Sequence, residues 1–177
     1  AVHDFDAIKR ALDIPLDDDI LGHLAALPAV EAAAKHAWLL EHERELAAAS
    51  QPAPGALELV RELRARDCRL GILTRNAHPL ALLTLQAIGL DDCFASADVI
   101  GRDEAPPKPD PGGLLHLAGQ WQVPTQALVM VGDYLFDLEC ARAAGAHGVL
   151  VNLPENPWPA LSSGYAEDCA ELLRQLS

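Results

Sequence analysis

Residues 127–137 read ALVMVGDYLFD, and this stretch decides the fold that the sequence predicts. An apolar run ends in Gly132 and Asp133, and a second acidic residue, Asp137, follows at the start of the next segment. An unbroken apolar run fits a strand that is buried on both faces, as the strands of parallel sheets are. Residues 136–144 then fit a helix, so the stretch predicts the strand–helix unit of an α/β fold.

The same alternation of strand and helix continues on both sides of this stretch. Short apolar runs predict further strands at residues 69–73, 98–100 and 148–151. Apolar residues at helical spacing predict helices at residues 56–66, 79–88, 111–121 and 167–176. This alternation predicts a doubly wound, Rossmann-like parallel sheet with helices on both faces. Ligands of such sheets bind beyond the carboxyl ends of the strands, so the residues that follow each strand are candidate site residues.

The first fifty residues have a different pattern, with predicted helices and no predicted strand. Asp4 is the expected N-cap of a first helix that Pro15 ends, and two more helices are predicted at residues 17–27 and 29–49. The sequence QPAPG that follows is typical of a linker. We therefore predict two domains, a small all-α domain over residues 1–51 and an α/β domain over residues 52–177.

Charge and composition exclude several classes of protein. The chain has 13 basic and 26 acidic residues, and a net charge of −13 repels nucleic-acid phosphates and anionic lipid. No apolar run approaches the roughly 20 residues that cross a bilayer. The four cysteines show no C-x-x-C spacing, which argues against a zinc site or a disulfide framework and predicts reduced thiols in a cytoplasmic protein.

Two of the loops that follow predicted strands carry groups suited to phosphate. Thr74, Arg75 and Asn76 offer a hydroxyl, a guanidinium and an amide that can donate hydrogen bonds to a phosphate. Lys108, one of three lysines, lies in the proline-rich loop at residues 104–111, where a stiff backbone could place its charge accurately. Each loop also has a purely structural interpretation, as a polar turn that caps a helix and as a turn with a solvated lysine.

The third loop carries two carboxylates. Asp133 ends the apolar strand and Asp137 begins the next helix, so both can face one point. Proteins bind Mg²⁺ through one or two carboxylates with retained waters, and this pair fits that chemistry. The structural interpretation is that Asp137 only complements the helix N-terminus and that Asp133 is only a turn residue.

The order of these groups resembles the motifs of the haloacid dehalogenase-like (HAD) hydrolase superfamily, in its phosphoglycolate-phosphatase-like branch with a small helical cap. GILTRN at residues 71–76 is similar to the second motif of that family and PPKPDP at residues 106–111 to its third. VMVGDYLFDLECARAAG at residues 129–145 is similar to the fourth, acidic motif. PAPGALELVREL at residues 52–63 resembles the return from cap to core.

The resemblance implies a magnesium-dependent phosphatase that acts on a small phosphorylated metabolite through an aspartyl-phosphate. By this resemblance the groups that bind the substrate phosphate are Thr74, Arg75, Asn76 and Lys108, with Thr74 and Lys108 also taking part in catalysis. Asp133 would ligate Mg²⁺, and Asp137 would be a further ligand or would act one step removed from the ion. The resemblance also implies a monomer or homodimer, with residues 1–51 as the cap.

The first motif of the family, a strand followed by Asp-x-Asp-Gly-Thr, is absent from the chain. Asp4 and Asp6 have the Asp-x-Asp spacing, but residues 1–3 are too few for a strand and the residues after Asp6 fit a helix. We interpret both as helix-start residues, and we expect the nucleophilic aspartate and the first strand of the sheet upstream of residue 1. The alternative is a truncated or degenerate, inactive member that binds a phosphorylated ligand or a protein.

Overall fold

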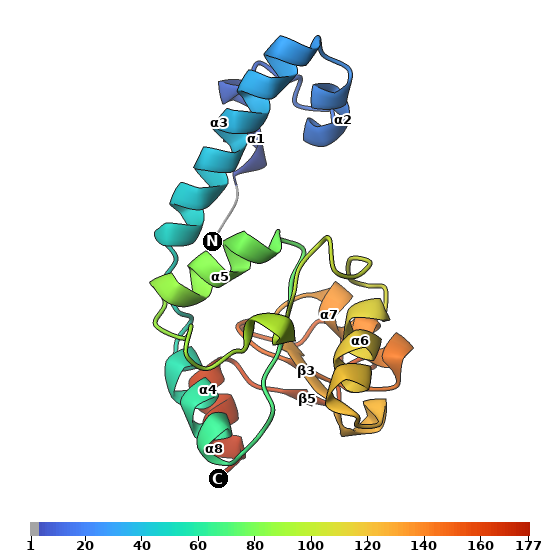
Figure 1. Cartoon of the computed structure of the whole chain (residues 1–177). Coiled ribbons are helices and arrows are strands. Elements are labelled where there is room, and N and C mark those ends of the chain that lie inside the picture. The colour runs from blue at the N-terminus through green and yellow to red at the C-terminus, as the bar shows by residue number, and fades with distance from the viewer. Residues whose placement is uncertain (1–3) are drawn as a thin grey trace. The chain divides into compact units, whose positions relative to one another are not determined.

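The N-terminal part of the protein is a small helical unit. The computed structural model describes residues 4–177, and the chain divides into two compact units between Ser50 and Gln51. The first unit contains three helices, α1 (Phe5–Ala11), α2 (Ile20–Ala25) and α3 (Ala29–Ala48), shown in blue in Figure 1. Its core consists of Ile8, Leu12, Ile14, Leu24 and Leu39.

The start of α1 confirms the interpretation of the two N-terminal acids. The Asp4 carboxylate accepts a hydrogen bond of 3.0 Å from the Ala7 backbone N–H, and Asp6 lies in the first turn of the same helix. Both are therefore helix-start residues. The prediction that residues 1–3 are too few to form a strand lies outside the described residues.

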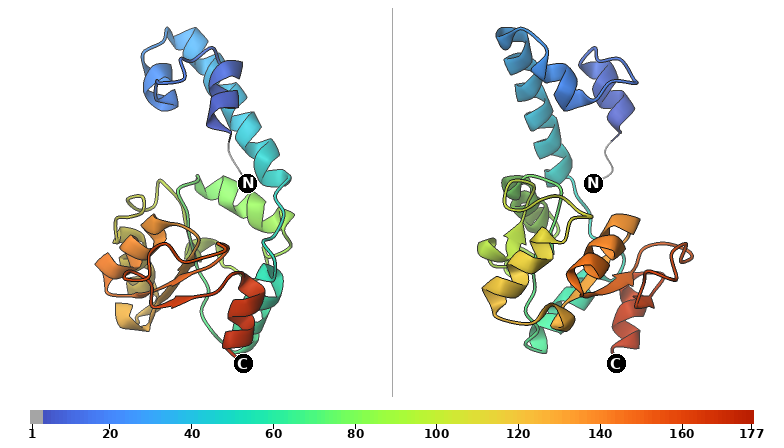
Figure 2. Two further views of the ribbon diagram at one scale, coloured as in Figure 1. Left: turned by 180° about the vertical axis from the view of Figure 1, so that it is seen from behind. Right: turned by 90° about the vertical axis from the view of Figure 1, so that its right-hand side faces the viewer.

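The second unit confirms the predicted α/β fold with parallel strands. Its helices are α4 (Ala56–Ala65), α5 (His78–Ala87), α6 (Gly112–Trp121), α7 (Leu135–Ala144) and α8 (Cys169–Gln175). Its strands are β1 (Ile72–Leu73), β2 (Val99–Ile100), β3 (Val129–Gly132), β4 (His147–Leu150) and β5 (Gly164–Tyr165). Short 3₁₀ turns at Ser96–Asp98 and Thr125–Ala127 precede β2 and β3. Figures 1 and 2 show the strands between α4 and α8 on one side and α6 and α7 on the other.

The strands form two separate sheets where one continuous sheet was predicted. β1 pairs in parallel with β2, and β3, β4 and β5 form a second parallel sheet in that order. Within residues 4–177, β1 and β3 each have one edge without a strand partner. Backbone N–H and C=O groups on such edges lack the ladder partners that a complete sheet would give them.

Two helices contact both sheets, one on each side. In α6, Leu114 belongs to a core cluster that includes Leu73 of β1 and Met130 of β3. In α4, Leu57 and Val60 pack in the cluster around β2, whereas Leu59 packs with Val149 and Val151 at β4. Because α4 and α6 each reach both sheets, the free edges of β1 and β3 border a common gap in the fold.

The backbone of β3 is directed partly toward this gap. The carbonyl oxygens of Leu128 and Gly132 accept hydrogen bonds from His147 and Val151 on the β4 side, at 3.0 and 2.9 Å. Because backbone groups alternate between the two edges of a strand, those of Val129 and Val131 point to the free edge.

Our prediction that residues 127–131 form a buried strand is wrong for two of its side chains. Val129 and Val131 are 58% and 39% exposed. The opposite face of β3 is covered, since Met130 packs into the cluster shared by α6 and α7. The prediction assumed a complete sheet covered on both faces, and no described element covers the Val129 and Val131 side of β3.

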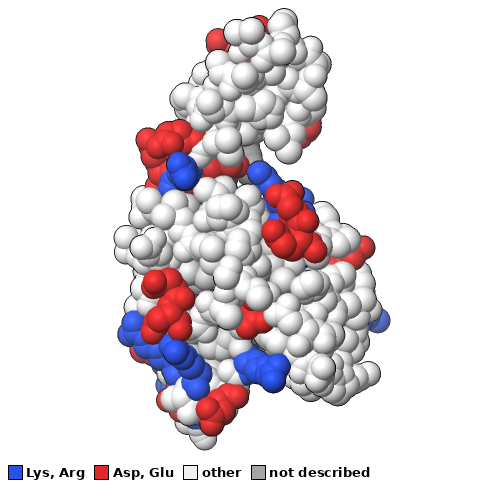
Figure 3. Space-filling view, in the orientation of Figure 1, with Lys and Arg blue, Asp and Glu red and all other residues white. Residues whose placement is uncertain are grey.

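One face of the protein carries its charges in separate small groups. On the face drawn in Figure 3, Lys and Arg side chains lie beside Asp and Glu side chains. Among residues 4–177, no helix has the length and apolar character needed to cross a bilayer. The four cysteines are free thiols, of which Cys140 and Cys169 are buried and Cys68 is exposed.

Candidate active site

Thr74 and Asp133 follow the two strands that border the gap. Thr74 comes directly after β1, and its backbone N–H donates to Ile100 O at 2.9 Å, which fixes the loop to β2. The Thr74 hydroxyl oxygen accepts a 3.1 Å hydrogen bond from the Asn76 backbone N–H. This bond forms a local polar turn that does not cap α5, whose N-cap is Ala77. The turn leaves the hydroxyl hydrogen free to donate to a ligand.

Lys108 and Asp137 form a buried ion pair. Lys108 Nζ lies 2.6 Å from Asp137 Oδ1, and the two side chains are 15% and 6% exposed. The loop before α6 and the first turn of α7 supply the two groups, so the interaction joins segments that are distant in the sequence. The alternative of a solvated lysine is therefore wrong, and the ammonium group is held at a defined position.

The second oxygen of Asp137 also has a partner within the protein. Asp137 Oδ2 accepts a 3.1 Å hydrogen bond from the Tyr134 backbone N–H, which caps α7. A Cβ atom on Gly132 would collide with the Asp137 carboxylate. The glycine before Asp133 thus makes room for Asp137, and the Gly-Asp sequence has a packing reason as well as a chemical one.

Asp133 differs from Asp137 because its carboxylate is exposed. Within the described part of the chain it takes part in no hydrogen bond or ion pair. Among these residues no group of three His, Cys, Asp or Glu side chains is arranged to hold a metal ion. One free carboxylate fits Mg²⁺, which retains waters and takes phosphate oxygens as ligands, but the donor set within residues 4–177 is only part of a site.

Arg75 and Asn76 occupy the exposed loop after β1. The Arg75 guanidinium lies over the Phe136 ring, with 5.8 Å from Cζ to the ring centroid, so this loop reaches the start of α7. The Asn76 carbonyl accepts a 3.0 Å hydrogen bond from the Arg102 backbone N–H. The structure thus brings Arg75 to α7 and Lys108 to Asp137, and within residues 4–177 no hydrogen bond joins Thr74 to Asp133.

The sequence reasoning missed an aromatic cluster beside Asp133. Tyr134 makes edge-to-face contacts with Phe136 and Trp158, with ring centroids 5.1 and 5.9 Å apart. Trp158 is a conspicuous aromatic residue in the turn-rich sequence NPWP at residues 156–159, but the sequence alone assigns it no role. Its neighbours could not be found from sequence because they lie on a different loop.

Cys140 lies on α7 behind the ion pair and is not a candidate nucleophile. Its thiol donates to the Asp110 carbonyl oxygen at 3.2 Å. Burial, together with the negative charge of Asp137, raises the pKa of the Cys140 thiol to about 11, against the lowering effect of Lys108. A thiol with that pKa stays protonated at neutral pH, and only the thiolate is a nucleophile.

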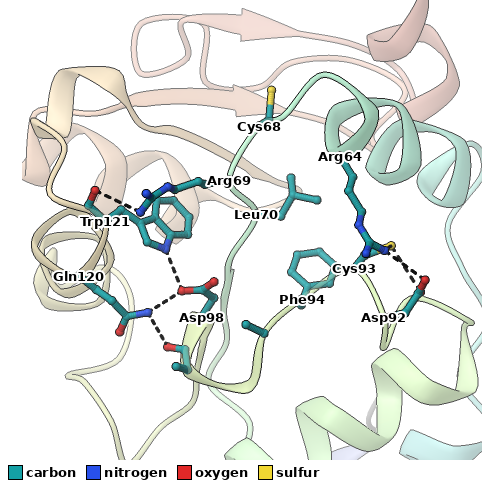
Figure 4. A pocket seen from close by; sticks show the side chains of 12 residues that line it. Arg64, Cys68, Arg69, Leu70, Asp92, Cys93, Phe94, Asp98, Gln120 and Trp121 are labelled. Atoms are coloured by element: carbon teal, nitrogen blue, oxygen red, sulfur yellow. Dashed lines mark hydrogen bonds and ion pairs between the residues drawn. The ribbon is translucent and has the colours of Figure 1, made fainter.

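A pocket of about 710 Å³ lies at the amino ends of β1 and β2, and Figure 4 shows side chains that line it, among them Arg69, Leu70 and Asp98. Residues that precede the two strands line it, so it is remote from the carboxyl-end loops. Its acidic groups have partners: Asp92 pairs with Arg64 at 3.1 Å, and Asp98 accepts from Trp121 Nε1 at 2.8 Å. We therefore place the candidate site at the opposite end.

Comparison with known proteins identifies the family of the chain. The family model described as haloacid dehalogenase-like hydrolase matches residues 6–145. A phosphoglycolate phosphatase of Nitrosospira multiformis is 34% identical over 143 residues, which are 79% of this chain and 59% of that relative. The chain thus covers less than two thirds of that relative's length.

Two solved structures show the same fold. A hydrolase from Pseudomonas syringae has a TM-score of 0.68 at 25% identity, with 97% of this chain and 87% of that chain covered. CbbY from Rhodobacter sphaeroides, in complex with xylulose-(1,5)bisphosphate, has a TM-score of 0.73 at 20% identity, with 95% and 86% covered. With its motifs, its fold and its phosphoglycolate phosphatase-like relatives, the chain belongs to the haloacid dehalogenase-like hydrolase family.

Proposed function

We propose that the protein is a magnesium-dependent phosphatase of small phosphomonoesters that works through an aspartyl-phosphate on a strand outside these 177 residues. The main support for this proposal is the division of the strands into two sheets, β1–β2 and β3–β4–β5. Thr74 and Asp133 end the two strands whose free edges border the gap. A strand inserted there, parallel to both and about 4.8 Å from each, would end between these residues and present its next side chains to both.

The residues of this chain divide the work of phosphoryl transfer. The Thr74 hydroxyl donates to a phosphoryl oxygen, and Arg75 and Asn76 line the phosphate pocket. Lys108, fixed by Asp137 at 2.6 Å, offsets negative charge on the phosphate and on the attacking carboxylate. Phosphoryl transfer depends on positioning and charge neutralisation more than on covalent chemistry by the protein, so a fixed ammonium group suits it.

Asp133 would hold Mg²⁺, with water and phosphate oxygens as its other ligands. When bound, the ion supplies additional charge neutralisation at the phosphate. Asp137 acts one step removed from the ion, because Lys108 and the Tyr134 N–H occupy both of its oxygens.

The relatives support a proposed substrate class, since they include phosphoglycolate phosphatases and a protein solved with a phosphorylated sugar. We propose a small phosphorylated metabolite, with the helical unit of residues 1–51 as a cap that excludes water during the reaction. A monomer or homodimer in the cytoplasm remains our prediction.

Hydrolysis of 4-nitrophenyl phosphate tests the proposal. The 177-residue chain and a chain extended at its N-terminus by an apolar strand ending in Asp-x-Asp are compared, each with Mg²⁺ and with excess chelator. We expect turnover only in the extended chain with Mg²⁺, and loss of it when the first added Asp becomes Asn. Turnover by the 177-residue chain would place the nucleophile within it, and an inactive but folded extended chain would favour the binding-module alternative.

A further inference from the structure

The aromatic cluster next to the candidate site consists of Tyr134, Phe136 and Trp158. Tyr134 and Phe136 come from the start of α7, directly after Asp133, and Trp158 comes from the loop between β4 and β5. Tyr134 stands between the other two, with interplanar angles of 71° to Phe136 and 88° to Trp158. Because both loops follow strands of one parallel sheet, the cluster lies at the same sheet edge as Asp133.

The backbone of the cluster is fixed, although its central ring is exposed. Tyr134 is tied to Asp137 in both directions, since its N–H donates to the carboxylate and its carbonyl accepts from the Asp137 N–H. The Trp158 N–H donates to Asn156 Oδ1 at 2.9 Å, and Asn156 in turn donates to Ser162. Yet the Tyr134 side chain is 53% exposed. Because its backbone is already fixed, such a surface would lose little conformational freedom on binding a ligand.

Arg75 connects this surface to the phosphate-binding side. Its guanidinium lies over Phe136, and in the described residues it has no carboxylate partner. Thr74 is its neighbour in the chain. The Phe136 end of the cluster therefore carries an uncompensated positive charge, that of Arg75, next to the proposed phosphate-binding residue Thr74. The other end of the cluster, at Trp158, is apolar.

We propose that Tyr134, Phe136 and Trp158 form an aromatic wall that selects phosphomonoesters whose leaving group carries a flat, conjugated ring. This inference rests on the proposed phosphatase function and narrows its substrate class. The ring of the ligand packs on the open surface of Tyr134 against Trp158, while Arg75 attracts its phosphate toward Thr74. Two aromatic rings in offset or edge-to-face contact gain more binding energy than the buried area alone gives. A saturated ring of similar size gains only the contribution from burial.

Binding of phosphonates to the 177-residue chain tests the wall without any need for catalysis. The probes are benzylphosphonate, cyclohexylmethylphosphonate and inorganic phosphate, each titrated with Mg²⁺ and followed by NMR of the tryptophan side-chain N–H signals. The chain has three tryptophans, Trp38, Trp121 and Trp158. Trp121 is an internal control, because its N–H is bonded to Asp98 in the remote pocket.

We expect benzylphosphonate to bind about three to ten times more tightly than cyclohexylmethylphosphonate and to shift the Trp158 signal, with Trp121 unchanged. Tyr134→Leu and Trp158→Leu should each reduce that preference toward unity while keeping the affinity for inorganic phosphate, which shows that the variants fold. Leu115→Ala, which removes an exposed apolar side chain of α6, should leave the preference unchanged.

Equal affinity for the two organic phosphonates overturns the aromatic wall, and the proposed phosphatase function then stands on its own. A preference that persists in both leucine variants overturns it as well. Failure of every probe to bind, inorganic phosphate included, overturns the phosphate site together with the wall.

Discussion

The two sheets of the α/β unit differ in how far this chain completes them. β3 and β4 pair over four residues each, α7 packs beside them, and the Lys108–Asp137 pair closes their part of the site. β1 and β2 pair over two residues, and Thr74 after β1 is held by two hydrogen bonds: its N–H donates to Ile100 O at the end of β2, and its hydroxyl accepts from the Asn76 N–H. Lys108 and Asp137 thus have their partners within this chain, whereas the free edges of β1 and β3 and the Asp133 carboxylate have none among residues 4–177.

The largest loss of stability should come from breaking the Lys108–Asp137 ion pair. Asp137→Ala removes the carboxylate, which leaves Lys108 as an uncompensated, largely buried charge and the Tyr134 N–H without its acceptor. We expect a loss of about 3–5 kcal/mol in the free energy of unfolding, measured by urea denaturation. Asp133→Asn is the matched control, and because Asp133 is exposed and unpaired it should change stability by less than about 0.5 kcal/mol. Equal losses in the two variants would remove the distinction between the two carboxylates.

A substitution at Gly132 should disturb the same ion pair, with a smaller loss of stability. Gly132→Ala places a Cβ against the Asp137 carboxylate, and we expect a destabilisation of about 1–3 kcal/mol. Gly119→Ala in α6 is the control, because nothing lies within 4 Å of the added Cβ there. That substitution should stabilise the protein by about 0.5–1 kcal/mol, since alanine is the better helix former. A neutral Gly132→Ala would show that Asp137 can move without loss.

A substitution of Thr74, which borders the gap, should reduce the free energy of unfolding by less than the substitutions at Asp137 and Gly132. Thr74→Ala removes the acceptor of the Asn76 N–H, a half-exposed local hydrogen bond, and we expect a loss of about 0.5–1 kcal/mol in the same denaturation assay. Thr74→Ser keeps the hydroxyl and should restore most of it. A loss as large as that of Asp137→Ala would mean that the loop after β1 is as firmly held as the ion pair.

The smallest expected effect is a difference in thiol reactivity between Cys68, next to the β1–β2 sheet, and Cys140, next to the β3–β4–β5 sheet. Cys68 precedes β1 and is exposed, whereas Cys140 is buried on α7 with its pKa raised to about 11. Because the raised pKa keeps Cys140 protonated, labelling with a thiol reagent at pH 8 should modify Cys68 first and Cys140 last. As the pH rises toward 11, Cys140 should lose its protection and the protein should lose stability, because the unfolded thiol ionises at lower pH than the folded one. Early labelling of Cys140 would contradict its burial.

The alternation of apolar runs with helical patterns was enough to predict the fold class, the parallel strands and the Asp4 cap, because these depend on local sequence. The Lys108–Asp137 contact and the aromatic cluster could not be predicted, since each depends on how loops from different strands meet. The exposure of Val129 and Val131 was missed for a related reason, because an apolar run does not reveal whether a neighbouring element will cover it.

The central claim is that a further strand belongs between β1 and β3, and amide hydrogen exchange of β3 tests it directly. The backbone N–H groups of Val129 and Val131 point to the free edge, so they should exchange rapidly in the 177-residue chain while their neighbours bonded to β4 are protected. In the chain extended by an N-terminal strand, both amides should slow by about a hundredfold or more, because they gain ladder partners. Unchanged exchange in the extended chain, or full protection already in the 177-residue chain, would contradict the account.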